Sequence, residues 1–272
     1  GFRFGPEQAQ VQFGFTEAYP IGMLYQKIVE LARSAPSFYL HTANTGWNNR
    51  MMQWVGATRI GINIPEIKDA CAILDEMRLV KTPEEISVME YAANVSALAH
   101  THAMQAVRPG MMEYELEAII SHEFRRNNGS ALHAYPPIIA GGKNACTLHY
   151  VENNKMLRDG DLVLVDAGCE YEWYASDITR TFPVSGRFST QQRFIYRLVL
   201  NAQKAAIGEA VPGKTIDDVD RKARTMIARG LQALGIVKAG DEEELIHRVT
   251  ERFFVHSTSH WWIYHCGIWR MV

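Results

Sequence analysis

The chain has 272 residues, a formal net charge of −2 and 21% charged residues, and its Lys and Arg residues form no long run. These values argue against a basic nucleic-acid-binding surface and a polybasic membrane-binding segment, and every apolar run falls far short of the about 18 residues that a membrane-spanning helix needs. We therefore expect neither nucleic acid nor membrane among its partners. The four cysteines form no Cys-x-x-Cys pair, so we expect reduced thiols in a cytoplasmic protein.

Residues 1–76 predict part of an α/β domain, because short helical and strand patterns alternate there without a catalytic motif. The first residues show neither a starting Met nor the basic-then-apolar order of a signal peptide, which indicates that the sequence begins inside a longer chain. The predicted elements are a helix over Ile21–Ala35, a strand over Phe38–Leu40 and a helix over Gly46–Val55.

A second domain is predicted over residues 77–272, and it opens with two helices. Thr82, Pro83 and Glu85 form a strong helix start: an N-cap Thr, a Pro at the first helical position and a Glu that completes a capping box. The next helix is predicted over Glu113–Arg126. Apolar residues at helical spacing predict that the first helix faces the core with a stripe made of Ile86, Met89, Ala93, Ala97 and Met104.

Strand patterns follow these helices, and two further helices follow the strands. Ser189 with Gln192 forms a second capping box, which opens the first of these further helices. The repeated order of helices hints at a duplicated unit. The predicted elements are strands over Pro137–Ala140, Cys146–Val151 around His149, Leu162–Val165 and Ile178–Val184, a turn over Gly168–Glu172, and a last helix over Thr215–Leu234.

Asp166 is the residue that most strongly indicates chemistry, because a carboxylate at the end of an apolar strand loses its hydration unless it is paired. A turn centred between Tyr171 and Glu172 would place Asp177 directly opposite Asp166, with Cβ atoms roughly 4.5–5.5 Å apart. Carboxylates that close repel each other unless a proton or a cation lies between them, and a divalent metal ion suits the oxygen ligands. The alternative is structural: Asp166 caps a turn and Asp177 makes a surface ion pair.

Several segments resemble the pita-bread metallopeptidases, and specifically the Xaa-Pro aminopeptidases and prolidases. The resemblance centres on Val165–Gly168 and Ser176–Val184, which contain the two aspartates, and it covers nearly the whole chain up to Trp261. The other segments that carry it are Gly5–Ala9, Arg78–Lys81 with Glu84 and Glu85, Arg108–Gly110 with Glu113 and Glu115, Leu148–Asn153, Phe188–Ser189 with Gln192 and Tyr196, Phe253–His256 and Ser259–Trp261.

The resemblance implies an α+β, pita-bread catalytic domain that follows part of a creatinase-like N-terminal domain. Asp166, Asp177 and His260 match metal ligands, while His149 and His256 match active-site histidines that contact substrate or stabilise the tetrahedral intermediate. The resemblance further implies two Mn²⁺ ions, with Zn²⁺ or Co²⁺ as alternatives, and a metal-activated hydroxide that cleaves the bond between an N-terminal residue and a following proline. The expected partners are peptides with proline at the second position and, in the intact family, further copies of the same chain.

The sequence departs from the family pattern after Trp261. Gly267 stands where the family has another histidine, and no residues match two glutamate ligands on the family's final strands, so the domain is expected to lack those strands. Two alternatives to an active aminopeptidase therefore stay open: an inactive pita-bread remnant that acts as a binding or oligomerisation module, and a prolidase-type dipeptidase. We expect structural roles for five other histidines, His100, His102, His122, His133 and His247.

Overall fold

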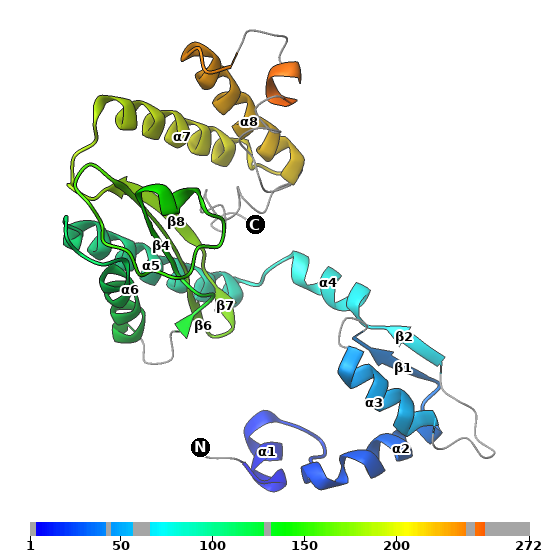
Figure 1. The fold of residues 1–272 in the computed structure, drawn as a ribbon. Helices are drawn as coiled ribbons and strands as arrows, with labels where there is room; N and C mark the ends of the chain where they lie inside the picture. Colours follow the sequence, from blue (N-terminus) through cyan, green and yellow to red (C-terminus); the bar gives the residue numbers. More distant parts are fainter. Residues whose placement is uncertain (1–3, 42–44, 57–65, 128–131, 238–242, 248–272) are drawn as a thin grey trace. The chain divides into compact units, whose positions relative to one another are not determined.

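A computed structural model describes residues 4–41, 45–56, 66–127, 132–237 and 243–247 of the chain. The chain divides into two compact units, Gly1–Val80 and Lys81–Val272, and each is described by itself (Figure 1). The position of the predicted domain boundary, between residues 76 and 77, falls inside helix α4 (Cys71–Leu79), and the boundary stays a prediction. Within the described residues, no helix combines the length and the hydropathy needed to cross a membrane.

The N-terminal unit is a small α/β arrangement, in which two parallel strands lie between helices. The predicted helix over 21–35 and the predicted strand and helix after it are confirmed, the first as a 3-10 turn that leads into α2. Among its described residues the buried apolar ones are Ala32, Leu40, Met51 and Val55. In chain order the elements are α1 (Pro6–Phe13), η1 (Ile21–Met23), α2 (Leu24–Ser34), β1 (Ser37–Leu40), α3 (Thr45–Gly56), β2 (Glu66–Asp69) and α4, with β1 and β2 in parallel register.

The second unit is built around an antiparallel sheet with the strand order β4 (Ile138–Gly141), β5 (Leu162–Ala167) and β8 (Ile178–Pro183). Two helices, α5 (Pro83–Ala106) and α6 (Glu113–Asn127), supply much of the rest of its core. Successive residues of a strand point to opposite faces, and in β5 it is Val163, Val165 and Ala167 that are fully buried in this core. The other face of β5 therefore carries Leu162, Leu164 and Asp166.

A shorter sheet continues from the same strands, with the order β3 (Leu132–His133), β6 (Cys169–Tyr171) and β7 (Tyr174–Ala175). Its hairpin turns at Glu172 and Trp173, which have φ angles of 48° and 70°. Positive φ at both positions is the backbone of a type I′ turn, whose twist matches that of the flanking strands. The predicted turn over Gly168–Glu172 is therefore wrong: most of that stretch is strand.

Helix α5 begins with the predicted capping box, in which Thr82 Oγ1 accepts from the Glu85 backbone N–H and Glu85 accepts from that of Thr82. Of the predicted core stripe, Met89 is buried and Ala93 is half-buried, but the prediction is wrong for Ala97, which is exposed, and for Ile86 and Met104, which are 44% and 40% exposed. Small side chains form the buried face instead and let the strands approach the helix closely. That face consists of Met89, Ala92, Val95, Ser96, Ala99, His100 and Ala103.

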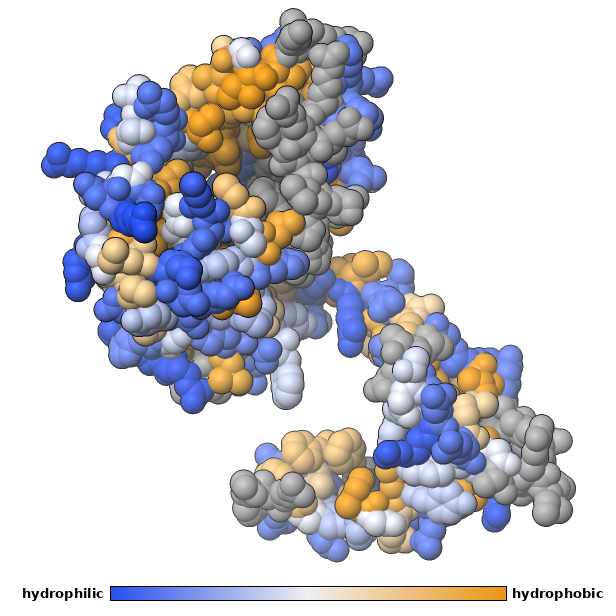
Figure 2. Space-filling model, in the orientation of Figure 1, coloured by the Kyte–Doolittle hydropathy of each residue, from blue (hydrophilic) through white to orange (hydrophobic). Residues whose placement is uncertain are grey.

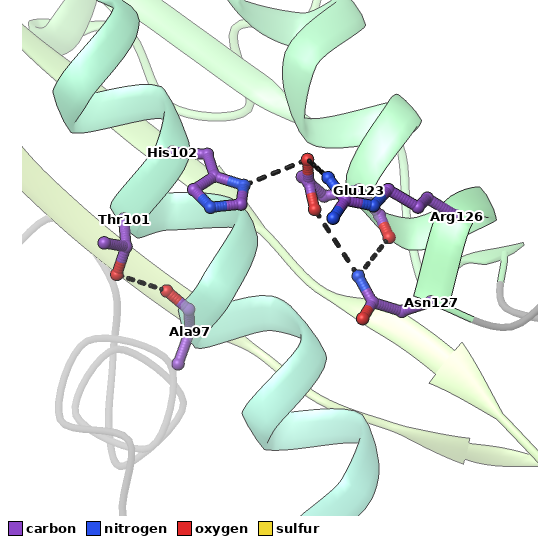
Figure 3. A network of polar contacts seen from close by, with 6 residues as sticks. All are labelled: Ala97, Thr101, His102, Glu123, Arg126 and Asn127. Carbon is purple, nitrogen blue, oxygen red and sulfur yellow. Dashed lines mark hydrogen bonds and ion pairs between the residues drawn. The ribbon is translucent and has the colours of Figure 1, made fainter.

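A polar network joins α5 to α6 on their outer side (Figure 3). Glu123 on α6 is 4% exposed, and its Oε1 lies 2.9 Å from Nδ1 of His102 on α5. Asn127 Nδ2 donates to the Glu123 carbonyl oxygen at 2.8 Å, and Arg126 contacts the same carboxylate. The nearly buried carboxylate is thus paired from both helices, which fits the structural role predicted for His102.

Helices α7 (Thr190–Glu209) and α8 (Ile216–Ala233) pack against each other, and both begin with capping boxes. The boxes are formed by Ser189 with Gln192, as predicted, and by Thr215 with Asp218. On α7, Ala202 and Ala206 are buried, whereas Ile195 and Val199 are 41% and 48% exposed. Apolar residues are visible on this part of the surface in Figure 2.

Candidate metal centre

The hairpin that carries the two aspartates has a register different from the predicted one. Asp166 on β5 lies opposite Thr179 on β8, and Asp177 lies two residues before Thr179, at the diagonal position. The cause is the turn at Glu172 and Trp173, whose centre falls one residue later than expected. A step of two residues keeps the same face of a strand, so both carboxylates still point to the side opposite α5 and α6.

Tyr135 joins the two carboxylates. This residue precedes β4, and its Oη lies 2.6 Å from Asp166 Oδ1 and 3.0 Å from Asp177 Oδ1. A phenol has only one proton to donate. Two carboxylates therefore share one donor, and the pair has more acceptor capacity than the described neighbours satisfy.

Burial and charge raise the proton affinity of this cluster. Desolvation, followed by the neighbouring charge of Asp166, raises the pKa of Asp177 to about 7, although the hydrogen bond from Tyr135 lowers it. Desolvation and the two carboxylates also raise the pKa of Tyr135 far above its ordinary value, so the phenol stays protonated. A divalent cation relieves the same repulsion that a proton relieves, and carboxylate oxygens are suitable ligands for Mn²⁺, Mg²⁺ and Zn²⁺.

Thr179 provides a second indication that the cluster is incomplete. Its side chain is buried beside Asp166, and its Oγ1 has no hydrogen-bond partner among the described residues. A buried hydroxyl without a partner is rare, and a bound ion with its water would supply one. The donor set thus fits a metal ion on one side, while within the described part of the chain no three His, Cys, Asp or Glu side chains converge to complete its coordination.

Buried hydroxyl groups hold the hairpin from the side of α5. Ser96 Oγ on α5 lies 2.7 Å from Ser176 Oγ, next to Asp177 in the chain, and both hydroxyls accept from the Cys169 backbone N–H. Gly168 lies so close to the opposite strand that an added Cβ would be 1.7 Å from the Ser176 carbonyl oxygen. Only glycine fits there, so the glycine two residues after Asp166 is required by the close approach of the two strands.

The histidines singled out in the sequence differ in their burial and in whether the structure describes them. His149 lies in an exposed turn with a φ of 51°, and the strand predicted over 146–151 is wrong. His256 and His260 lie outside the described residues, so their roles stay predictions. His100 is buried on α5, where Nδ1 lies 2.8 Å from the Ser96 carbonyl oxygen and desolvation lowers the pKa of the ring.

Tyr135 and Thr179 are the site residues that the sequence did not single out. Thr179 was part of the motif Asp177-Ile178-Thr179, and its position opposite Asp166 follows only from the register. Tyr135 stands before two prolines and a short strand, and nothing local marks it. A search for polar residues that flank the strand next to β5 would have found it.

Comparisons with known proteins can now be set beside this geometry. The model of metallopeptidase family M24 matches residues 87–263, well over half of the chain. The chain belongs to metallopeptidase family M24. An Xaa-Pro aminopeptidase of Haemophilus influenzae is 43% identical over 266 residues, which cover 96% of this chain and 59% of that protein.

Solved structures of aminopeptidases have the same fold. The aminopeptidase PepP of Pseudomonas aeruginosa superimposes with a TM-score of 0.89 at 42% identity, over 94% of this chain and 59% of that one. A Zn-substituted aminopeptidase P of Escherichia coli, in complex with product, gives 0.89 at 39% identity over 94% and 60%. These similarities confirm the predicted α+β pita-bread class and the resemblance to Xaa-Pro aminopeptidases. The chain spans about three-fifths of the length of these relatives.

Proposed function

We propose that this chain is a metal-dependent aminopeptidase, or the corresponding part of one, which removes an N-terminal residue that precedes proline. The observation that carries the proposal is the pair of carboxylates, Asp166 and Asp177, which share the single hydroxyl proton of Tyr135. Membership of a metallopeptidase family and the identity to Xaa-Pro aminopeptidases support the reaction class and the substrate. The proposal includes a cytoplasmic location, which the cysteine pattern suggested, and a homo-oligomer, which the family resemblance suggested.

In the proposed site Asp166 and Asp177 hold Mn²⁺, or Zn²⁺ or Co²⁺ in its place, together with His260. When bound, such an ion acidifies water and polarises the carbonyl of the peptide that is cleaved. The described residues position the two carboxylates. Tyr135 donates to Asp166 and Asp177 and fixes their orientation, while the contact between Ser96 and Ser176 holds the chain beside Asp177 against α5. His149 and His256 are proposed to contact the substrate.

The experiment is metal binding followed by hydrolysis. Titration of the metal-free chain with Mn²⁺ in a calorimeter should show binding that Asp177→Ala abolishes, while Asp217→Ala, on the exposed first turn of α8, should leave it unchanged. With Mn²⁺ present, Xaa-Pro peptides should lose their N-terminal residue, and peptides with alanine in place of proline should not. Mn²⁺ binding that is the same in Asp177→Ala would contradict the proposed site.

A second candidate function is an inactive pita-bread module that binds other chains. The finding that favours it is that, among the described residues, only two carboxylates come together and no further ligand joins them. The stoichiometry of binding separates the candidates: two metal ions per chain support the peptidase, whereas a chain that binds none and releases no amino acid from Xaa-Pro peptides supports the module.

A further inference from the structure

Glu113, the first residue of α6, has a fully buried side chain that none of the proposed catalytic roles uses. Its Oε1 accepts from the Gly141 backbone N–H and from Asn144 Nδ2, both at 2.9 Å. Its Oε2 accepts from Tyr150 Oη at 2.7 Å and from the Lys155 backbone N–H at 2.9 Å. A buried carboxylate is stable when its oxygens are paired, and four donors pair this one without a cation.

All four donors belong to one segment of the chain, which runs from the end of β4 to residue 155 and contains His149. Gly141 is the last residue of β4, Tyr150 follows His149 directly, and Lys155 ends the segment. The Glu113 backbone N–H also donates to the Lys155 carbonyl oxygen at 2.9 Å. One carboxylate therefore holds the beginning, the middle and the end of the loop that carries His149.

This loop lies on the face of the sheet that carries Asp166. The ring of Tyr150 packs in a cluster with Ile138, Ala140 and Leu164. In the register, Ile138 is the partner of Asp166, and Ala140 is the partner of Leu164. Opposite residues of an antiparallel pair point to the same face, so Tyr150 is anchored on the side where the carboxylates lie.

The backbone at His149 needs such an anchor. Its φ of 51° is a left-handed conformation, which costs a residue other than glycine about 1 kcal/mol or more and persists only when the surroundings impose it. The His149 side chain is exposed, whereas Tyr150 is 8% exposed and its hydroxyl is fixed at both Glu113 and Asn144. The conformation of His149 is thus set from its buried neighbour.

We propose that Glu113 is a positioning residue for the reaction: through the hydroxyl of Tyr150 it fixes the backbone of His149 and the direction in which that imidazole faces the substrate. The role of His149 toward substrate rests on the proposed function, but the positioning itself does not. Glu113 acts on His149 through Tyr150 and touches neither the substrate nor the proposed metal ligands.

The loop has a second attachment, which makes a mild test feasible. Asn153 is 4% exposed; its Oδ1 accepts from the Ile139 backbone N–H at 2.9 Å, and its Nδ2 donates to Glu117 Oε2 at 2.8 Å and to the Pro137 carbonyl oxygen at 2.9 Å. These bonds stay when the hydroxyl of Tyr150 is deleted. Tyr150→Phe therefore removes the link to Glu113 and leaves both the ring packing and the end of the loop in place.

The experiment compares Tyr150→Phe with Tyr91→Phe in the whole chain. Tyr91 Oη donates to the Asn127 carbonyl oxygen at 2.8 Å, a bond of similar length far along the chain from the loop. In ¹³C-histidine-labelled protein, with the His149 signal assigned by its loss in His149→Gln, we expect Tyr150→Phe to shift the His149 ring resonance. We expect Tyr91→Phe to leave that resonance in place. Where the parent hydrolyses Xaa-Pro peptides, Tyr150→Phe should lower kcat/KM about tenfold, as the loss of an orienting partner does.

A variant of Glu113 gives the second arm. Glu113→Gln leaves an amide hydrogen facing one of the donors, so it should shift the His149 signal in the same direction as Tyr150→Phe and further. Should it fail to fold, Tyr150→Phe decides alone. If the His149 resonance in Tyr150→Phe is at the same position as in the parent chain and in Tyr91→Phe, the positioning role is overturned. A parent chain without peptidase activity overturns the proposed function only, because the histidine signal is read without turnover.

Discussion

Two buried groups of carboxylates in the second unit each contain a tyrosine hydroxyl, and they differ in the balance of donors and acceptors. At Asp166 and Asp177, two carboxylates share one phenol proton. At Glu113, one carboxylate receives four donors, one of them the hydroxyl of Tyr150. The first group has too few donors for its two carboxylates, whereas every oxygen of the Glu113 carboxylate accepts two hydrogen bonds. Burial alone therefore does not distinguish the proposed metal site from the Glu113 site; the excess of acceptors at Asp166 and Asp177 does.

The largest effect is expected at the satisfied carboxylate. Glu113→Ala leaves four donors without their acceptor, and the free energy of unfolding should fall by about 3–5 kcal/mol. Glu115 is an exposed glutamate of the same helix and accepts from the Met112 backbone N–H at 2.7 Å. Glu115→Ala should lower the free energy of unfolding by no more than about 1 kcal/mol. Urea denaturation of both variants measures the difference, and equal losses would mean that the four bonds contribute nothing special.

The unsatisfied pair should behave in the opposite way. Because the folded-state pKa of Asp177 is raised from 3.8 to about 7, the folded metal-free chain binds this proton more tightly than the unfolded chain does. Protonation of Asp177 therefore raises the free energy of unfolding by at most about 4 kcal/mol. This stabilisation is fully present below the ordinary pKa of 3.8 and is lost as the pH rises through about 7. Asp177→Asn should therefore remove most of the decline in stability between pH 4 and 7, measured by urea denaturation across that range. A decline that is unchanged in Asp177→Asn would mean that other groups cause it.

A metal ion should replace the missing proton. At pH 8, Mn²⁺ at a hundred times its Kd should stabilise the chain by about 2.7 kcal/mol, read as a rise of the thermal midpoint that EDTA reverses. Asp166→Asn should lose this rise, whereas Tyr150→Phe, in the loop held by Glu113, should keep it. A rise of the same size in Asp166→Asn would place the ion elsewhere.

The smallest effect is expected from the shared phenol. Tyr135→Phe removes a hydrogen bond that lowers the pKa of Asp177, so the pH at which stability declines should move upward. The loss in stability should be about 1 kcal/mol, the net contribution of one hydrogen bond. Tyr91→Phe is the control, since its hydroxyl bonds a backbone carbonyl oxygen; a shift in both variants would reflect the loss of any tyrosine hydroxyl.

The parts of the fold that the sequence predicted correctly are those determined by near neighbours. The helix starts at Thr82 and Ser189 follow from residues three positions apart, and both capping boxes are present. The strand β5 follows from an apolar run, and β8 was predicted as the strand that returns after the turn. The two aspartates follow from their motif. Their shared face was also predicted correctly, because an error of one residue in the turn moves the cross-strand partner by two residues and so keeps the same face of the strand.

The parts that were wrong depend on contacts between distant residues or on unusual backbone. The hairpin turns at Glu172 and Trp173, neither of which is a turn glycine or asparagine, so the turn was placed one residue early and the partner of Asp166 two residues early. The core face of α5 was assigned from apolar residues at helical spacing, whereas the buried face of the helix includes Ala92, Ser96 and Ala99. Tyr135 reaches its carboxylates across 31 and 42 residues of sequence, a separation that no local pattern encodes.

The capping boxes of α5, α7 and α8 have a consequence for the order in which the chain folds. Each box pairs its backbone donors within a span of four residues, so the first turn of each helix requires no contact with the rest of the protein. Local structure of this kind forms in about a microsecond, whereas the hairpin with its Gly168–Ser176 contact has to wait for strands to align. The helix ends are thus available as fixed points on which the aspartate hairpin can assemble, and nucleation is expected at α5 rather than at the strands that carry the chemistry.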